Sequence, residues 1–360
     1  MARIAVIAGD GVGSEVTEEA LHVLEVLSGE EGFALGWDHW PLGADRYLET
    51  GQTLTESEFR TLSDEYDAIL LGAMGDPRVP SNVHARDILL GLRFRLDLYV
   101  NYRPSRLLHP SLSPLRGGGA MDLHLFRENT EGSYGGLGGI LREGTPDEVA
   151  IQEDVSTWMG VERILRRAFE FSRARGLDRV TMVDKANAMP HAGRLWRRLF
   201  DEVGEEFPEI ERSAQYVDAM AMDLIRNPGA HQVVVTSNLF GDILSDEAAA
   251  LTGGMGLAPS ANLNPGEHAL FEPVHGSAPD IAGKGIANPI AAIRCVGLLM
   301  EYLGREDLRE VVEEAVIDAL AEGWRTPDIG GERKTDEVGG WITDRVRTLL
   351  DETKTGEGVP

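Results

Sequence analysis

The sequence is poor in cysteine and lysine, and it has no long apolar run. The single cysteine, Cys295, excludes an internal disulfide and a zinc site built from cysteines, and it suits a reducing compartment. No stretch reaches the ~18 apolar residues that a membrane-spanning helix needs. The chain opens with Met-Ala-Arg-Ile and runs directly into an apolar stretch, so we expect no signal peptide, no membrane partner and a cytoplasmic location.

Positive charge is also scarce. The formal net charge is −26, and 30 of the 34 basic residues are arginines. Nucleic acids and anionic membrane surfaces repel such an acidic chain, so neither is an expected partner. The composition favours a halophile-like acidic surface, which stays hydrated in high salt. A moderately acidic protein from a GC-rich genome, which also favours arginine, is the alternative.

What remains is the pattern of a folded α/β protein. With 360 residues, of which 42% are hydrophobic, the chain is long enough for two packed domains, and it has no repeat or low-complexity linker. Short β-branched runs alternate with longer amphipathic segments. Strands are expected near 3–8, 67–72, 122–127, 149–152, 179–185 and 231–236. Helices are expected near 14–27, 161–175, 290–303 and 311–322, the last being the final clear helix before a loose tail past Asp351.

The stretch that organises the chain follows the apolar strand at 231–236. It reads Ser237-Asn238-Leu239-Phe240-Gly241-Asp242-Ile243-Leu244-Ser245-Asp246-Glu247 and continues as a helix toward Gly253. Asp242 and Asp246 are then one helical turn apart and lie on one face. Such a pair either binds a hard divalent cation, Mg²⁺ or Mn²⁺, or forms a solvated acidic face. The buried strand before the pair favours the metal site.

Three other features bear on function. The turn Gly9-Asp10-Gly11-Val12-Gly13 lacks the G-x-G-x-x-G spacing of a Rossmann dinucleotide site, so a tight turn is the better interpretation. Arg93 and Arg103 bracket one segment and would together suit a di-acid, although most arginines lie on the surface. Lys185 is the first lysine of the chain and ends a predicted strand. Unlike arginine, lysine can lose its proton when it is desolvated.

Four motifs, spread over nearly the whole chain, point to one family. They are Ile7-Ala8-Gly9-Asp10-Gly11-Val12-Gly13, Arg127-Glu128-Asn129-Thr130-Glu131-Gly132, Asn238-Leu239-Phe240-Gly241-Asp242-Ile243-Leu244-Ser245-Asp246 and Glu272-Pro273-Val274-His275-Gly276-Ser277-Ala278-Pro279-Asp280. Together they resemble the β-decarboxylating dehydrogenases, a family that includes isocitrate, isopropylmalate, homoisocitrate and tartrate/malate dehydrogenases.

The resemblance implies an architecture. It is an α/β, isopropylmalate dehydrogenase-like two-domain fold with a shared mixed sheet, not a Rossmann fold. Residues 1–98 and 253–360 would form a discontinuous dinucleotide-binding domain, and residues 99–252 a domain for substrate, metal and dimerisation. The resemblance further implies a homodimer whose active sites are shared across the interface, with NAD and Mg²⁺ or Mn²⁺ as cofactors.

The resemblance also implies roles for single residues. Lys185 would be the base and Tyr134 the acid, and Asp242 and Asp246 would bind the metal together with Asp218 of the partner subunit. Substrate would be held by Arg93, Arg103, Arg127, Asp218, Asn187, Leu89 and Leu90. The dinucleotide would be held by Glu272, His275, Gly276, Ser277, Ala278, Pro279, Asp280, Ile281 and Asn288.

Which di-acid the protein oxidises stays open at this level. Asp184-Lys185-Ala186-Asn187 and the run from Gln215 to Met222 resemble isopropylmalate dehydrogenases. The Arg127–Gly132 motif, with Arg86, resembles tartrate/malate dehydrogenases more closely. We therefore predict oxidative decarboxylation of 3-isopropylmalate, with tartrate or D-malate and then homoisocitrate as alternatives. A catalytically silent regulatory subunit is the alternative from another class, and such a chain should have lost a catalytic residue.

Overall fold

The computed structural model describes residues 2–30, 33–116 and 119–355. The described chain forms two compact units: Met1–Leu96, Leu107–Gly118 and Ala249–Pro360 in the first, and Asp97–Arg106 and Gly119–Ala248 in the second. Residues 107–118 pack with the first unit, although a single cut after residue 98 would assign them to the second. Among the described residues, no helix has the length and apolar character needed to cross a membrane.

The strands of the first unit are paired in a mixed arrangement. In spatial order, they are β2 (Leu35–His39), β1 (Ala2–Gly9), β3 (Ala68–Ala73), β12 (His268–Pro273) and β11 (Pro259–Asn264). The first three neighbouring pairs are parallel, and the pair of β11 with β12 is antiparallel. Every residue of β3 is buried, as expected for a strand covered on both faces.

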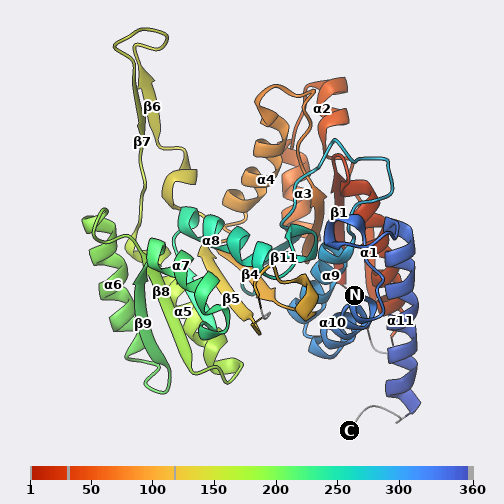
Figure 1. Cartoon of the computed structure of the whole chain (residues 1–360). Helices are drawn as coiled ribbons and strands as arrows, with labels where there is room; N and C mark the ends of the chain where they lie inside the picture. Colours follow the sequence, from red (N-terminus) through yellow and green to blue (C-terminus); the bar gives the residue numbers. More distant parts are fainter. Residues whose placement is uncertain (1, 31–32, 117–118, 356–360) are drawn as a thin grey trace. The chain divides into compact units, whose positions relative to one another are not determined.

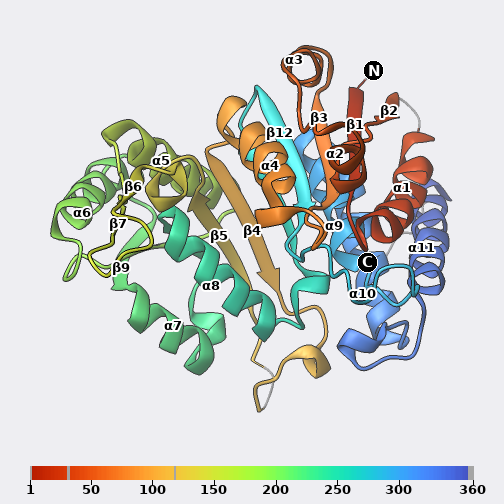
Figure 2. The same cartoon turned by 90° about the horizontal axis from the view of Figure 1, so that it is seen from above.

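The α-helices described in this unit are α1 (Gly13–Ser28), α2 (Ala44–Thr50), α3 (Glu56–Glu65), α4 (Val83–Arg95), α9 (Ile290–Tyr302), α10 (Glu306–Ala321) and α11 (Thr335–Thr355), and α1 and α9 pack on the strands. Helix α1 packs against α9 and α11 (Figure 1, Figure 2). Helix α9 is buried along almost its whole length, from Ile290 to Met300. The predicted helices at 14–27, 290–303 and 311–322 are confirmed as α1, α9 and α10.

Helix α11 corrects the prediction that the helix near 311–322 is the last one. It continues to Thr355, so the tail predicted to be loose past Asp351 is helical that far, and residues 356–360 lie outside the described residues. Its fully buried residues Val338, Ile342 and Val346 recur every four positions, a helical spacing. The pair Gly339-Gly340 lowers the intrinsic helix propensity and hides this pattern. Gly339 has a packing reason, because an added Cβ would lie 2.1 Å from Oε2 of Glu19 on α1.

The strands of the second unit are also paired in a mixed arrangement. In spatial order, they are β4 (Val100–Arg106), β5 (Asp122–Glu128), β10 (Val233–Thr236), β8 (Arg179–Asp184) and β9 (Glu211–Tyr216). The pair β4–β5 is antiparallel and the other pairs are parallel. The helices are α5 (Trp158–Ala174), α6 (Pro190–Gly204), α7 (Val217–Arg226) and α8 (Asn238–Leu251). Carboxyl ends of neighbouring parallel strands lie together, so the residues that follow β10 and β8 are neighbours.

A two-stranded arm extends from the second unit. It pairs β6 (Gly138–Leu141) with β7 (Val149–Gln152) in antiparallel register, and all eight residues are exposed (Figure 1). The strand predicted at 149–152 is therefore confirmed, but it pairs only with β6 and belongs to a separate sheet. The α/β class with mixed sheets is confirmed in both units.

Candidate active site

Two carboxylates on α8 form the centre of the candidate site. Strand β10 is buried throughout, and α8 begins two residues after it, at Asn238. Asn238 is buried; its side-chain oxygen accepts hydrogen bonds from Arg127, and its amide donates to the Glu131 carbonyl at 3.0 Å. These bonds fix the start of α8, and Asp242 and Asp246 then lie one turn apart on it, as the sequence predicts.

Two arginines hold these carboxylates. Arg127, at the end of β5, is 1% exposed and contacts Asp242. Arg103, on β4, donates to Ser245 Oγ at 2.6 Å and to Asp246 Oδ1 at 3.1 Å, and it lies 3.7 Å from Asp242. Gly241 allows this close packing, because an added Cβ would lie 2.7 Å from Arg127 Cβ. The arrangement offsets the like charges of the two aspartates.

The donor set fits a divalent cation. Burial raises the pKa of Asp246, and the neighbouring Asp242 carboxylate raises it further, while Arg103 opposes both effects. Two carboxylates that disfavour each other's charge are stabilised by a cation, and Mg²⁺ and Mn²⁺ prefer such oxygen ligands. Within the described part of one chain, no group of three or more His, Cys, Asp or Glu side chains is arranged to hold a metal. Mg²⁺ is commonly bound by one or two protein carboxylates, with water or substrate oxygens completing its coordination.

Tyr134 faces the same carboxylate. It lies on a 3-10 turn, η3 (Gly132–Gly135), and its hydroxyl donates to Asp242 Oδ2 at 3.1 Å. The Arg127 guanidinium lies 5.1 Å from the centre of its ring. Burial raises the pKa of Tyr134, and the Asp242 charge raises it further. The phenol therefore carries a proton at neutral pH, as a proton donor must, and its raised pKa makes it a weaker acid than an ordinary tyrosine.

Lys185 and Asp218 form a second cluster. Lys185 follows β8, and its ammonium contacts the carboxylate of Asp218 in the first turn of α7. This hydrogen bond lowers the pKa of Asp218. Asn187, on the same loop, is exposed. In the part of the chain that the structure describes, no hydrogen bond or ion pair connects this cluster with Asp242 or Asp246.

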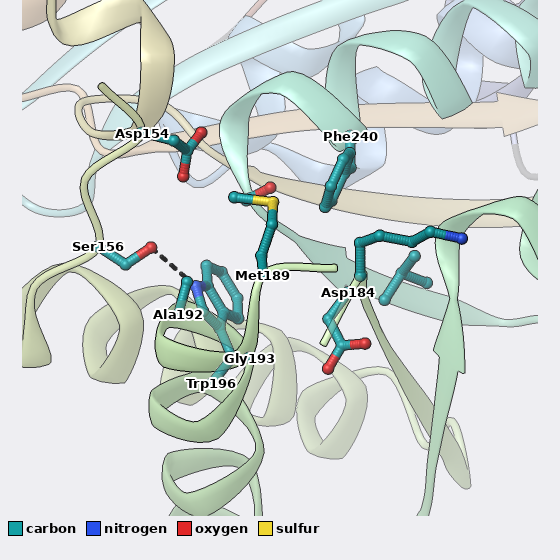
Figure 3. A pocket seen from close by; sticks show the side chains of 11 residues that line it. Asp154, Ser156, Asp184, Met189, Ala192, Gly193, Trp196 and Phe240 are labelled. Atoms are coloured by element: carbon teal, nitrogen blue, oxygen red, sulfur yellow. Dashed lines mark hydrogen bonds between the residues drawn. The ribbon is translucent and has the colours of Figure 1, made fainter. Parts of the chain in front are cut away.

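A small pocket lies beside Lys185 (Figure 3). Its wall includes Met189, Trp196 and Phe240, and the indole of Trp196 donates to Ser156 Oγ at 3.2 Å. Phe240 comes from α8 and Trp196 from α6, so this pocket connects the loop of Lys185 with the first turn of α8. The wall of this pocket is mainly apolar.

In the first unit, α4 presents the predicted substrate residues. Arg93 is buried, and its guanidinium lies 3.6 Å from Glu272 on β12. Leu89 and Leu90 are half-buried, whereas Ile88 and Leu92 on the same helix are fully buried. Ile88 and Leu92 therefore provide the core contacts of α4. Leu89 and Leu90 keep exposed apolar surface that could contact a ligand.

The predicted dinucleotide loop follows β12. Asn262 donates to Glu272 at 2.8 Å, and Asn288 donates to Asp328 at 3.1 Å. Nδ1 of His275 pairs with the Gly276 carbonyl at 3.0 Å, and burial lowers the pKa of His275. The other ring nitrogen, Nε2, is buried and has no hydrogen-bond partner among the described residues. A buried ring atom of this kind fits a site that binds a polar ligand.

The other predicted loop residues differ in exposure. Ser277 is buried, Ala278 and Ile281 are half-buried, and Gly276, Pro279 and Asp280 are exposed. Ala278 has a φ of 37°, a left-handed conformation that residues with a side chain rarely adopt. Backbone conformations of this kind concentrate at ligand-binding segments. The loop therefore exposes the carboxylate of Asp280, and contacts with the rest of the protein must hold Ala278 in its left-handed conformation.

Several site contacts could not be read from the sequence. Asn238 and Ser245 lie inside the organising stretch, but nothing local indicates that they bond Arg127 and Arg103. Buried Asp10 accepts hydrogen bonds from the amides of Ala44 and Gly75 and pairs with buried His84 at 2.8 Å. The tight-turn interpretation of Gly9–Gly13 agrees with this packing.

Comparisons with known proteins agree on one family. Residues 3–342 match the isocitrate/isopropylmalate dehydrogenase family model. A 3-isopropylmalate dehydrogenase of Corynebacterium urealyticum is 47% identical over 96% of this chain and 99% of its own length, and one of Thermobifida fusca is 46% identical over 96% and 97%. The crystal structure of isocitrate dehydrogenase from Methylococcus capsulatus is 34% identical with a TM-score of 0.87, covering 96% of this chain and all of that one. A β-decarboxylating dehydrogenase from Thermococcus kodakarensis is 38% identical with a TM-score of 0.81, covering 98% of each chain.

Proposed function

Because the chain belongs to the isocitrate/isopropylmalate dehydrogenase family, we propose that it is an NAD-dependent and divalent-metal-dependent enzyme of leucine biosynthesis. It would oxidise (2R,3S)-3-isopropylmalate and release CO₂ to give 4-methyl-2-oxopentanoate, in the cytoplasm. The observation that supports this best is the group around α8, where Asp242 and Asp246 face Arg103, Arg127 and Tyr134. A turnover assay with the single purified chain tests it, and a silent regulatory subunit would give no turnover.

The residues have chemically suitable roles. When bound, NAD would accept the hydride from C2, and the metal would act as a Lewis acid toward the developing negative charge. Arg103 and Arg127 bind substrate carboxylates, for which a guanidinium offers paired donors. Lys185 removes the proton of the 2-hydroxyl group. Tyr134, which keeps its proton, donates one to carbon after CO₂ leaves.

The departure from the isopropylmalate pattern at 127–132 has a structural explanation. Glu131 accepts hydrogen bonds from the backbone and hydroxyl of Thr157, which begins α5. Asn129 donates to the Leu98 carbonyl at 2.9 Å, and Glu128 accepts from the backbone of Thr130 and Glu131. Glu128 stabilises its own loop, and Glu131 and Asn129 bind this loop to neighbouring segments, so the variant motif has a structural role that does not depend on the substrate.

We propose a homodimer because much apolar surface of the second unit is exposed. Met222 and Ile225 on α7 and Ile243 on α8 are each more than half exposed. The arm and the first residues of α5 add more exposed apolar side chains: Leu137, Ile140, Leu141, Val149, Ile151, Trp158 and Met159. Patches of this kind mark protein interfaces. Ile243 lies beside Asp242, so a partner that covers it would come close to the metal carboxylates.

Substrate preference gives one prediction. An isopropyl group against Leu89 and Leu90 adds three carbons, worth ~2.4 kcal/mol at ~0.8 kcal/mol each, so kcat/KM for 3-isopropylmalate should exceed that for D-malate by about 50-fold. Leu90→Ala should reduce this ratio toward one while D-malate turnover is largely kept. Leu48→Ala, at an exposed leucine of α2, is the control and should leave the ratio unchanged. A wild-type preference for tartrate or D-malate would make the assignment wrong.

Cofactor preference gives a second prediction. In the described part of the chain, the Asp280 carboxylate forms no ion pair. A carboxylate can accept hydrogen bonds from ribose hydroxyls, but it repels a 2′-phosphate. NAD⁺ should exceed NADP⁺ in kcat/KM by at least ~10²-fold, or about 2.7 kcal/mol at 1.36 kcal/mol per decade. Asp280→Asn should narrow this gap and Asp351→Asn, on exposed α11 surface, should not. Equal use of NADP⁺ by the wild type contradicts the assignment.

A further inference from the structure

The turn between β1 and α1 holds the predicted dinucleotide loop by its backbone. The amide of Val12 donates to the Ser277 carbonyl at 2.9 Å. Gly11 has a φ of 57°, and an added Cβ would lie 2.0 Å from the same carbonyl oxygen. The glycines of this turn therefore permit a close approach between two segments that are more than 260 residues apart in the sequence.

Glu15, in the first turn of α1, holds the far end of the same loop. One carboxylate oxygen accepts a hydrogen bond from the Gly283 amide, and the other accepts from the Gly285 amide at 3.1 Å. Both glycines have positive φ values, 74° and 61°. This conformation directs two backbone donors that are two residues apart toward one carboxylate, and hydrogen bonds to a charged acceptor are stronger than neutral ones.

The opposite side of this segment is held by the last helix. The amide of Thr335 donates to the Gly285 carbonyl at 3.0 Å, and its hydroxyl donates to the Ala287 carbonyl at 2.7 Å. The loop end is thus fixed between α1 and α11, which also pack against each other. Between the two held ends, Ser277 and Gly283, lie Ala278 to Ile281, including the strained Ala278, and His275 and Gly276 directly precede the first held end.

We propose that Glu15 is a positioning residue for the dinucleotide: its carboxylate fixes Gly283-Lys284-Gly285, and thereby keeps the loop from His275 to Ile281 in its binding conformation before the cofactor arrives. The proposal rests on the proposed function, which assigns this loop to NAD. A loop that is ordered in advance loses less conformational freedom on binding and so binds more tightly. Glu15 makes no contact with the cofactor in this role; it acts through the loop backbone.

The alternative role for Glu15 is to stabilise α1 itself, because an acidic side chain in the first turn interacts favourably with the helix N-terminus. Glu18 lies three residues later on the same helix and is exposed, so Glu18→Gln is the control for losing a carboxylate from α1. Glu15→Gln keeps the size of the side chain but supplies one acceptor instead of two and brings an NH₂ donor against an amide donor. Glu15→Asp keeps the charge near the helix end but is shorter by one C–C bond of about 1.5 Å, so it cannot reach both amides.

The experiment compares Glu15→Gln, Glu15→Asp and Glu18→Gln with the wild type. Hydrogen exchange of the cofactor-free protein is measured for peptides covering 275–288, and NAD⁺ affinity is measured by titration together with KM and kcat. For both Glu15 variants we expect faster exchange of the loop and an approximately tenfold higher Kd and KM for NAD⁺. The kcat and the KM for 3-isopropylmalate should stay within about twofold, and Glu18→Gln should match the wild type.

The outcomes separate the two levels of the proposal. Unchanged loop exchange in Glu15→Gln, or an Asp variant that equals the wild type in both measurements, overturns the role of Glu15. Faster exchange with unchanged NAD⁺ affinity overturns the positioning role, because the order of the loop would then contribute nothing to cofactor binding. Absence of NAD⁺ binding by the wild type would instead overturn the proposed function. A fall in kcat and thermal stability without a change in NAD⁺ affinity would mean that Glu15 only supports the fold.

Discussion

Dialysis against EDTA should abolish oxidation of 3-isopropylmalate, and addition of Mn²⁺ or Mg²⁺ should restore it. Stabilisation of developing charge by a metal is worth several kcal/mol, and each 1.36 kcal/mol corresponds to a factor of ten, so the rate should fall by on the order of 10³-fold. The structural reason is the pair Asp242 and Asp246, whose negative charges are partly offset by Arg103 and Arg127 and would be stabilised further by a cation. Formation of NADH measures the rate.

The control for this experiment addresses the ligands themselves. Asp246→Asn should weaken Mn²⁺ binding, measured by calorimetry without substrate or NAD, whereas Asp344→Asn on exposed α11 surface should leave it unchanged. Asp246 is suited to this test because its side chain is half exposed and Arg103 keeps its bond to Ser245 when the carboxylate is lost. Full activity in metal-free protein would remove the metal from the proposed mechanism.

Local pattern was sufficient for much of the fold. The helix at α5 was predicted from the 3.6-residue spacing of Val161, Ile164, Leu165 and Ala168, all of which are fully buried. Strand β10 was predicted because three valines and a threonine, all β-branched, follow one another, which fits a strand that is buried on both faces. The prediction failed at α11, where paired glycines and many charges conceal a regular buried stripe.

The candidate site also has a part that the sequence predicts and a part that it does not. The spacing of Asp242 and Asp246 fixes their common face, because both lie on one helix. The partners of these residues come from distant segments: Arg127 is 111 residues from Asn238, and Glu15 is 268 residues from Gly283. No local periodicity encodes such contacts. Glu15 carries only the weak signal of an acidic residue at the start of a helix, which does not distinguish it from Glu18.

Lys185→Met should lower kcat by ~10²-fold or more, since a positioned acid or base typically contributes 10²–10⁴. Lys185 and Asp218 of one chain are bonded to each other, so we expect both side chains to belong to the same active site. Lys354→Met is the control, because Lys354 lies on the exposed surface of α11 and pairs with Glu30 at 2.9 Å. It should keep kcat within about twofold.

Mixing inactive Lys185→Met subunits with inactive Asp246→Asn subunits should restore activity if each site uses Asp246 of one chain and Lys185 of the other. After random exchange of equal amounts, half of the dimers are mixed and each has one intact site, so about a quarter of the wild-type activity should return. The reason to expect this result is the proposed homodimer with shared sites, together with the exposed apolar Ile243 next to the metal carboxylates. Subunit exchange is demonstrated by mass spectrometry of differently tagged chains. If exchange occurs and activity does not return, Lys185 and Asp246 serve the same chain's site, and the exposed apolar surface around Ile243 needs another explanation.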